Sequence, residues 1–279
     1  MPETTLIAEQ PAPQPDQTGP VVVFDNVSIA FEDKQVLEDI SFTVEPGETR
    51  IVLGPAGCGK SVLMKLANGL LCPDSGSIHV FGEEVSKMPE VDLFTLRARI
   101  GMVFQESALF DSMTVCDNVA FRMHEEHMPE DEVQQRVLES LRFVELEQAV
   151  NKFPSELSGG MRRRVAIARA VVSKPELILY DSPTGGLDPI TSTTIIELVM
   201  KQRDVFHNTA LVVTHRLQDA FTLATHEYDV QEHTMKPIPN KGIDPKTKFL
   251  VLNEGRIVFD GTTMDLVHTD DPWLKEYLS

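Results

Sequence analysis

Eight residues in the first quarter of the chain, Gly-Pro-Ala-Gly-Cys-Gly-Lys-Ser at positions 54–61, constrain the fold more than any other feature of the sequence. An apolar run at 50–53 precedes them and predicts a short buried strand, and apolar residues at helical spacing follow over 62–70. Glycines let the backbone curl so that several N–H groups point at one anion, and the start of a helix adds partial positive charge. Strand, glycine-rich turn and helix in this order predict an α/β domain that binds phosphate.

Two features predict that the phosphates are bound together with Mg²⁺. Lys60 would neutralise β- and γ-phosphate oxygens, and the hydroxyl of Ser61 would ligate Mg²⁺. Asp181 follows an apolar run at 177–180, and a carboxylate at the carboxyl end of a parallel strand can hold the same Mg²⁺, directly or through water. The residues assigned to the phosphate cradle are Gly54, Pro55, Ala56, Gly57, Cys58, Gly59, Lys60, Ser61 and Val62.

The composition argues against nucleic acid as a partner. The chain has 25 Lys and Arg against 43 Asp and Glu, a net charge of -18, whereas a phosphate backbone demands clustered cations. Its three cysteines, Cys58, Cys72 and Cys116, are odd in number and widely spaced, which indicates a reducing compartment. The sequence has neither an apolar run of membrane-spanning length nor the pattern of a secretory signal. We therefore expect a cytoplasmic protein.

Changes in composition along the chain predict its organisation. Residues 1–20 hold five prolines and few large apolar side chains, which predicts a disordered tail. From position 21, apolar runs alternate with helical patterns, and this alternation indicates an α/β core. Apolar runs at 249–252 and 257–259 flank Asn-Glu-Gly and predict a hairpin. The prolines and the glycine within 229–247 predict an insertion in a surface loop.

Further motifs occur in an order that matches a known family. Leu-Ser-Gly-Gly-Met at 157–161 resembles the signature sequence of the ABC transporter ATPases. Gln105 is similar to the glutamine of that family's Q-loop, and Gly-Gly-Leu-Asp at 185–188 is similar to its D-loop. His215 resembles the switch histidine, which ends a strand. The resemblance extends over about 21–261 and implies an ATP-binding subunit of a transporter.

The resemblance implies the fold. It is a P-loop NTPase (RecA-like) core of the α/β class, with an antiparallel β subdomain and an inserted α-helical subdomain at about 106–157. One ATPase domain would then extend over 21–279. In this family the helical subdomain receives a coupling helix from the membrane subunits.

The resemblance also implies that two copies bind ATP head to tail. Ser158, Gly159 and Gly160 would lie at the start of a helix, where free N–H groups favour an anion. By resemblance, they clasp the γ-phosphate of ATP in the cradle of the other copy. The remaining assignments from the family are Gln105 at Mg²⁺ and the attacking water, His215 as a catalytic residue, Asp188 in the nucleotide site and Phe31 on the adenine.

Three arginines follow the signature, Arg162, Arg163 and Arg164, and they lie unfavourably near the positive end of the helix dipole. Two interpretations stay open for each of them. They would face phosphate or an acidic surface across the dimer, or they would form a solvated basic face.

One residue departs from the family pattern. Most members have a glutamate after the strand-end aspartate, where it polarises the attacking water, but here Ser182 follows Asp181. A hydroxyl is a poor proton acceptor near neutral pH and carries no charge. We expect ATP binding and dimer closure to survive, while hydrolysis is slow or depends on His215. Alternatively, a partner subunit supplies the missing group.

Three details favour one branch of the family, the Mla/Mce-type phospholipid transport ATPases. They are Met161, where glutamine is commoner, the segment at 104–115, and Pro-Ser-Glu-Leu at 154–157. The expected partners are membrane permease subunits and an Mce-type lipid-binding subunit, with the chain peripheral on the cytoplasmic face of the membrane. Two alternatives stay open: an ATPase of a polar amino-acid importer, and a regulatory subunit that closes on ATP without turnover.

Overall fold

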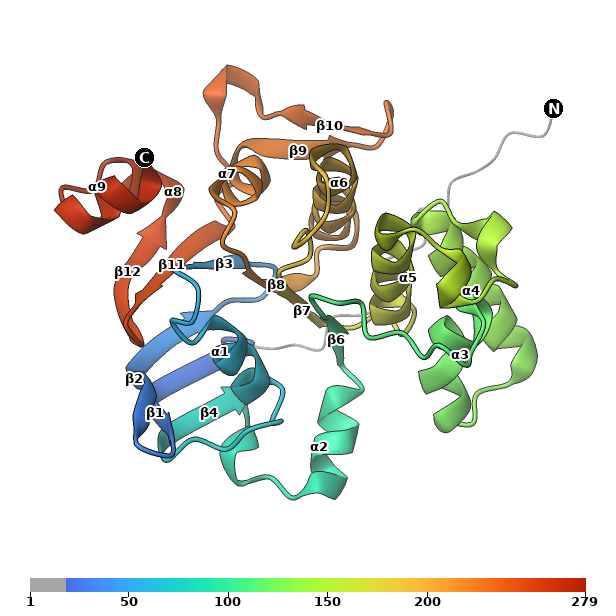
Figure 1. Cartoon of the computed structure of the whole chain (residues 1–279), viewed down its shortest axis with the longest axis horizontal. Coiled ribbons are helices and arrows are strands. Elements are labelled where there is room, and N and C mark those ends of the chain that lie inside the picture. The colour runs from blue at the N-terminus through green and yellow to red at the C-terminus, as the bar shows by residue number, and fades with distance from the viewer. Residues whose placement is uncertain (1–18) are drawn as a thin grey trace.

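A six-stranded sheet forms the centre of the molecule in the computed structural model, which describes residues 19–279 (Figure 1). The tail predicted at 1–20 lies almost wholly outside the described residues. The strand order is β12-β11-β3-β8-β7-β6, and the pairs from β11 to β6 are parallel, whereas β12 is antiparallel to β11. The strands are β3 (Thr49–Leu53), β6 (Ile100–Val103), β7 (Leu177–Asp181), β8 (Thr209–Val213), β11 (Thr247–Asn253) and β12 (Arg256–Thr262).

Both faces of this sheet are covered, which explains why its parallel strands are continuously apolar. Successive side chains of a strand point to opposite faces. Ile51 and Leu53 accordingly pack into a core with α3 to α9, whereas Val52 packs into a second core with α1, α2 and another sheet. The helices are α1 (Lys60–Ala67), α2 (Glu90–Arg97), α3 (Val115–Glu125), α4 (Glu130–Phe143), α5 (Gly159–Val171), α6 (Pro189–Phe206), α7 (Leu217–Thr225), α8 (Thr263–Val267) and α9 (Pro272–Leu278).

The second sheet is antiparallel, with the order β2-β1-β4-β5. Its strands are β1 (Val22–Phe31), β2 (Lys34–Val44), β4 (Ser75–Val80) and β5 (Glu83–Glu84). It lies on the side of the central sheet that α1 covers, while α6 and α7 lie on the other side (Figure 1). The α/β class and the antiparallel β part are confirmed.

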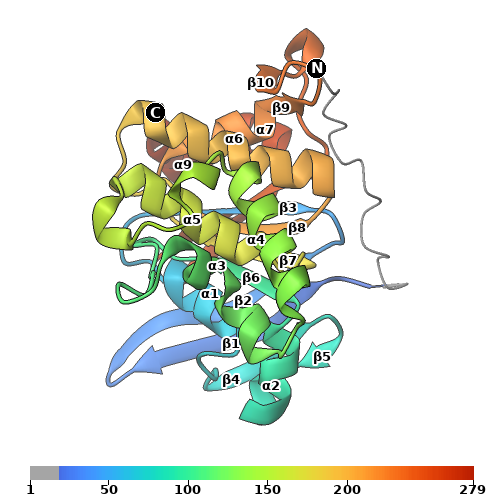
Figure 2. The ribbon, with the colours of Figure 1, turned by 90° about the vertical axis from the view of Figure 1, so that its right-hand side faces the viewer.

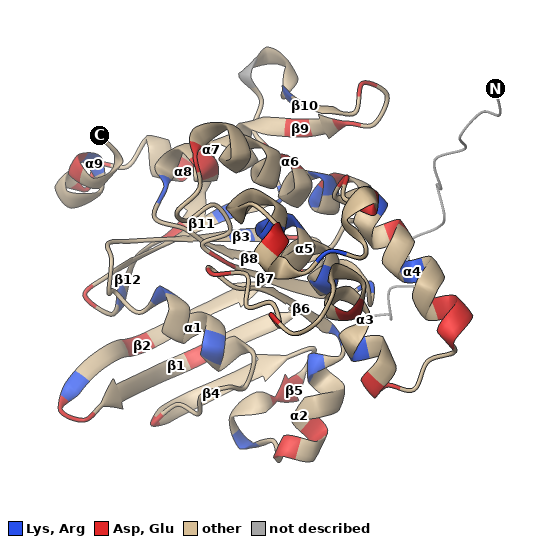
Figure 3. Ribbon diagram, turned by 45° about the vertical axis from the view of Figure 1, so that its right-hand side comes forward, with Lys and Arg blue, Asp and Glu red and all other residues tan. Residues whose placement is uncertain are grey.

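Three helices gather beside the edge strand β6 (Figure 2). The helix α5 packs against α3, α4 and β6, so it joins the helical layer to the central sheet. A capping box starts α3, because Thr114 and Asp117 satisfy each other's backbone N–H groups. Acidic residues fill the first turn of α4 and complement its dipole (red in Figure 3). Among the described residues, none of the helices combines the length and apolar character that a membrane crossing requires.

The segment at 229–247 differs in part from the predicted loop. A hairpin of β9 (His226–Asp229) and β10 (Thr234–Pro237) occupies its beginning, and a short 3₁₀ helix (Pro239–Lys241) follows. Lys236 donates a hydrogen bond to Asp229 at 2.6 Å and thereby lowers the pKa of that carboxyl to about 2. Because this segment holds prolines and charged residues, its sequence pattern does not indicate the pairing of β9 and β10. The hairpin predicted at 249–259 is confirmed by the antiparallel pairing of β11 and β12.

Candidate functional site

Four neighbouring strands bring the predicted motifs to one edge of the sheet. The phosphate loop follows β3, His215 lies two residues after β8, Asp181 ends β7, and Gln105 lies two residues after β6. Asp181 pairs with Val213 across β7 and β8. Because parallel strands end at the same edge, segments far apart in sequence meet there, which is where open α/β sheets bind ligands.

The phosphate loop has the geometry that its glycines allow. Gly59 caps α1 with φ +102°, and a side chain there would collide with Leu37 of β2. Gly54 has φ +148°, and a Cβ atom at that position would collide with the carbonyl of Leu252. Ala56 and Gly57 are exposed at the tip of the loop. The loop is therefore fixed against β2 and β11 at its base and open to solvent at its tip.

The ammonium group of Lys60 is held by carbonyls of the loop itself. It donates hydrogen bonds to the oxygens of Gly54 at 2.8 Å and Pro55 at 2.7 Å, and it lies 3.6 Å from the sulfur of Cys58. Cys58 is buried, which fits a small residue that fills the loop. A bound phosphate would offer Lys60 an anionic oxygen in place of these neutral carbonyls. Hydrogen bonds between ionised groups are stronger than those to neutral acceptors.

Ser61 and Asp181 meet although 120 positions separate them. The Ser61 hydroxyl donates to Oδ1 of Asp181 at 3.3 Å. A hydroxyl and a carboxylate are oxygen ligands of the kind that Mg²⁺ prefers, and Mg²⁺ commonly takes one or two carboxylates together with substrate phosphates. The donor set therefore fits this ion. Ser61 and Asp181 would hold it beside the phosphate loop.

Ser182 directly follows Asp181, at the position where the family resemblance leads us to expect a glutamate. Its backbone has φ +47°, its side chain is buried, and its hydroxyl lies 3.5 Å from Oδ1 of Asp181. The N–H group of Ser182 donates to Val213 on β8 at 2.9 Å, so the backbone is held by the sheet. His215, in contrast, is exposed. The backbone next to Asp181 is thus held by the sheet, and it carries a hydroxyl where a carboxylate would accept a proton.

Gln105 lies against the turn that follows Ser182. A Cβ atom built on Gly185 would contact Cγ of Gln105 at 3.4 Å and its Nε2 at 3.5 Å. The strand that precedes Gln105, β6, is parallel to β7, and Val103 pairs with Tyr180 in the register of the two strands. Gln105 therefore reaches the same edge as Asp181, as the sequence predicts, and its role at Mg²⁺ stays a prediction.

Arg163 is a residue of this site that the sequence reasoning missed. Its guanidinium is buried and donates to the carbonyls of Ser182 at 3.0 Å and Pro183 at 2.9 Å. It also donates to the carbonyls of Gln105 and Gly185. One cation thus ties α5 to both loops that flank Asp181, and burial lowers its pKa.

Both interpretations of Arg163 offered above are therefore wrong, because it neither faces another molecule nor belongs to a solvated face. Helical spacing could have indicated that Arg163 is buried. Ala166 and Ile167 lie three and four residues further along the same helix, and both are fully buried. Arg162 is exposed, and Arg164 donates to the carbonyl of Val144.

We expect Arg163→Gln to destabilise the protein by about 2–4 kcal/mol, because it leaves several buried carbonyls without donors. Urea unfolding of the full chain measures this free energy. Arg162→Gln removes an exposed arginine from the same turn, whose guanidinium donates one hydrogen bond to the Leu157 carbonyl, and should change this free energy by less than about 1 kcal/mol. Equal stabilities of the two variants would contradict the assignment.

The signature residues start α5. Ser158 caps the helix by accepting the N–H of Met161 at 3.2 Å, and both Ser158 and Gly159 are exposed. Gly160 is close to Thr191 on α6, where a side chain would collide. The contacts described for these residues are with Met161 on α5, with Leu187 and with Thr191 on α6, and not with the phosphate loop. Their exposed helix start is open to an anion from another molecule.

Asp188 and Phe31 lie at the margins of the site. Asp188 caps α6, since it accepts hydrogen bonds from the Thr191 hydroxyl at 2.6 Å and the Thr191 N–H at 3.0 Å, and these bonds lower its pKa. Phe31 ends β1 with 44% of its surface exposed, in the hairpin whose second strand contacts Gly59. That exposure agrees with a face free to stack on a base, and the two nucleotide roles stay predictions.

Comparisons with known proteins agree with this arrangement. The family model described as ABC transporter matches residues 37–185. The intermembrane phospholipid transport system ATP-binding protein MlaF of Haemophilus influenzae is 32% identical over 91% of this chain and 88% of its own length. The methionine import ATP-binding protein MetN of Bifidobacterium longum is 37% identical over 72% of this chain, which covers about half, 52%, of that relative.

A solved structure shares the fold. The dimeric, post-hydrolysis ATP-binding cassette MJ0796 bound to ADP and Pi superimposes with a TM-score of 0.73 at 28% identity, over 86% of this chain and 98% of the other. The phosphate loop, Asp181 and the start of α5 all lie within the residues that the family model matches. The chain belongs to the ABC transporter family, as one of its ATP-binding subunits.

Proposed function

We propose that the chain binds ATP with Mg²⁺ at the phosphate loop and uses its hydrolysis to drive transport through separate membrane subunits. The contact of Ser61 with Asp181 carries this proposal, because it joins the phosphate loop to a metal-binding carboxylate. Lys60 would neutralise the phosphates, and Gln105 would reach the metal and the attacking water. The bound Mg²⁺ would supply charge neutralisation at the transferred phosphate.

Two copies would close head to tail around two nucleotides. The exposed N-terminus of α5 supports this, because Ser158 and Gly159 offer N–H groups that this chain's own loop does not use. The superimposed cassette is dimeric and holds ADP and Pi. The domain that forms this dimer would extend over 21–279, with the helical subdomain at 106–157.

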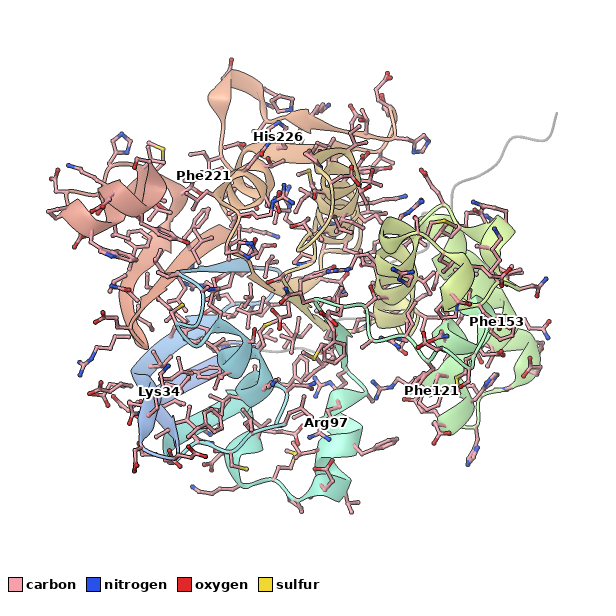
Figure 4. All side chains as sticks on the ribbon, in the orientation of Figure 1. Lys34, Arg97, Phe121, Phe153, Phe221 and His226 are labelled. Atoms are coloured by element: carbon pink, nitrogen blue, oxygen red, sulfur yellow. The ribbon has the colours of Figure 1, made fainter. Side chains whose placement is uncertain are left out.

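The membrane subunits would dock where aromatic side chains are exposed between the helical subdomain and α2. Phe110 and Phe153 are each 42% exposed, and Phe94 on α2 is 58% exposed. Figure 4 shows Phe121 and Phe153 on the helical side and Arg97, at the end of α2, across from them. Arg122 on α3 donates to the carbonyl of Arg97 at 2.6 Å, so the two sides touch. The chain would then lie on the cytoplasmic face of the membrane without crossing it.

The transported substrate would be a phospholipid or a related lipid. The Haemophilus influenzae relative, named for intermembrane phospholipid transport, matches over nearly the full length of both chains. An Mce-type lipid-binding subunit would then belong to the same complex. The methionine import relative favours an amino-acid importer as the second candidate. Ser182 favours a third, a subunit that closes on ATP with little hydrolysis.

Co-purification of the tagged full chain with membrane proteins, followed by extraction of bound lipid, tests the substrate class. We expect permease subunits and co-purified phospholipid. Phe153→Ser should reduce permease recovery at least about threefold, because it removes an exposed aromatic anchor from the docking face. The control Val267→Ser changes an exposed position on α8 and should leave permease recovery unchanged. Recovery of an amino-acid-binding subunit without lipid would favour the second candidate.

A further inference from the structure

The last helix of the chain contacts the first residue of the phosphate loop. The N–H group of Gly54 donates a hydrogen bond to the Tyr277 hydroxyl at 3.0 Å, across 223 positions of sequence. Tyr277 lies on α9, which no motif of the nucleotide site includes. We propose that Tyr277 is a positioning residue of the phosphate loop. This inference rests on the proposed binding of ATP at that loop.

The Gly54 N–H group needs an acceptor outside the sheet. Leu53, the residue before it, ends β3 and pairs with Val251 of β11, and Gly54 then turns away with φ +148°. Gly54 is buried, and a buried N–H group without a partner carries a desolvation penalty. The Tyr277 hydroxyl supplies the acceptor at the residue where the regular ladder ends and the loop begins.

Gly54 also links Tyr277 to Lys60. The carbonyl of Gly54 accepts a hydrogen bond from the Lys60 ammonium at 2.8 Å, so two hydrogen bonds join Tyr277 to Lys60. A β- or γ-phosphate oxygen would compete with that carbonyl for Lys60. Tyr277 would then hold Gly54 in place while Lys60 changes partner, and the loop would keep the curvature that directs its N–H groups at the phosphates.

Packing fixes the hydroxyl in position. Leu274 on α9 is 1% exposed, and Asp271 caps the helix by accepting the Leu274 N–H at 2.9 Å. The ring of Trp273 stacks on that of Tyr277 with centroids 5.3 Å apart and planes 4° apart. Trp273 is the only tryptophan in the sequence. Its fluorescence therefore reports on the environment of Tyr277 without any label.

The experiment compares Tyr277→Phe with the parent full chain, because phenylalanine keeps the ring and its stack and removes only the hydroxyl. We expect the Kd for ATP to rise about three- to tenfold, the effect of one hydrogen bond. We also expect the change of Trp273 emission on ATP addition to shrink, because the substitution removes the hydrogen bond that joins α9 to the phosphate loop. Tyr228→Phe, in the hairpin of β9 and β10, is the matched control and should keep both parent values.

A second variant separates the hydroxyl from the packing of α9. Trp273→Phe keeps the Tyr277 hydroxyl and an aromatic partner for its ring, so its Kd should stay at the parent value. An unchanged Kd in Tyr277→Phe, or an emission change equal to that of the parent, would overturn the inference. A parent chain that binds no ATP would instead contradict the proposed function, so the two failures are distinguishable.

Discussion

Replacing Lys60 by alanine is expected to weaken ATP binding by about 3 kcal/mol, roughly 100-fold in Kd, and to abolish ATP-dependent pairing of two chains. The ammonium group lies within the loop, bonded to the carbonyls of Gly54 and Pro55, and it is the cation of that loop. Without it, the β- and γ-phosphates would lose a charge-assisted partner. Isothermal titration with ATP measures the first effect, and gel filtration with and without ATP measures the second.

Lys65→Ala is the matched control for this experiment. Lys65 is exposed in the last turn of the same helix, α1, so its removal changes the net charge equally without touching the loop. The Kd of the Lys65→Ala variant for ATP should stay within about twofold of the parent value. Tight ATP binding by Lys60→Ala would mean that the loop is not the nucleotide site.

Ser182→Glu is expected to raise steady-state ATP turnover of the assembled complex by about 10- to 100-fold. A positioned general base contributes typically about 10²- to 10⁴-fold, and residue 182 lies next to Asp181 with its backbone held by Val213 and Arg163. A carboxylate there would accept the proton that a hydroxyl cannot accept near pH 7. Phosphate release by the complex with its membrane subunits measures the rate.

Ser182→Gln separates charge from shape. Glutamine has nearly the size of glutamate, and both would occupy the same left-handed backbone position, with φ +47°, so the strain is matched. The glutamine variant should turn over no faster than the parent because an amide is no base. Unchanged phosphate release in Ser182→Glu would indicate that a partner subunit already supplies the missing group, or that the subunit does not rely on hydrolysis.

The central sheet and the phosphate loop could be predicted because their signals are local. A run buried on both faces is apolar throughout, as at Leu177 to Tyr180, and three glycines within six residues mark a turn that other residues cannot adopt. The meeting of Ser61 and Asp181 could also be predicted, because parallel strands end at one edge. These features depend on residue type and spacing alone.

The contacts of Arg163 and Tyr277 could not be predicted, because they join distant segments of the chain, although helical spacing could have indicated that Arg163 is buried. An arginine within a run of three resembles part of a solvated basic face, whereas Arg163 is buried against the loops that follow β6 and β7. A tyrosine near the end of the sequence carries no signal for a glycine 223 positions earlier. The hairpin at 226–237 was missed for a different reason: its strands are short, charged and only partly buried, so they lack the alternation that marks most strands.

The strand order of the central sheet has a consequence for synthesis of the protein on the ribosome. The strand β3, made early, lies between β8 and β11, which are translated more than 150 residues later. Until Thr247–Asn253 has left the exit tunnel, the phosphate loop lacks one of its supporting neighbours. Nascent chains therefore should not capture nucleotide, and their apolar β3 edge should depend on chaperones until late in translation.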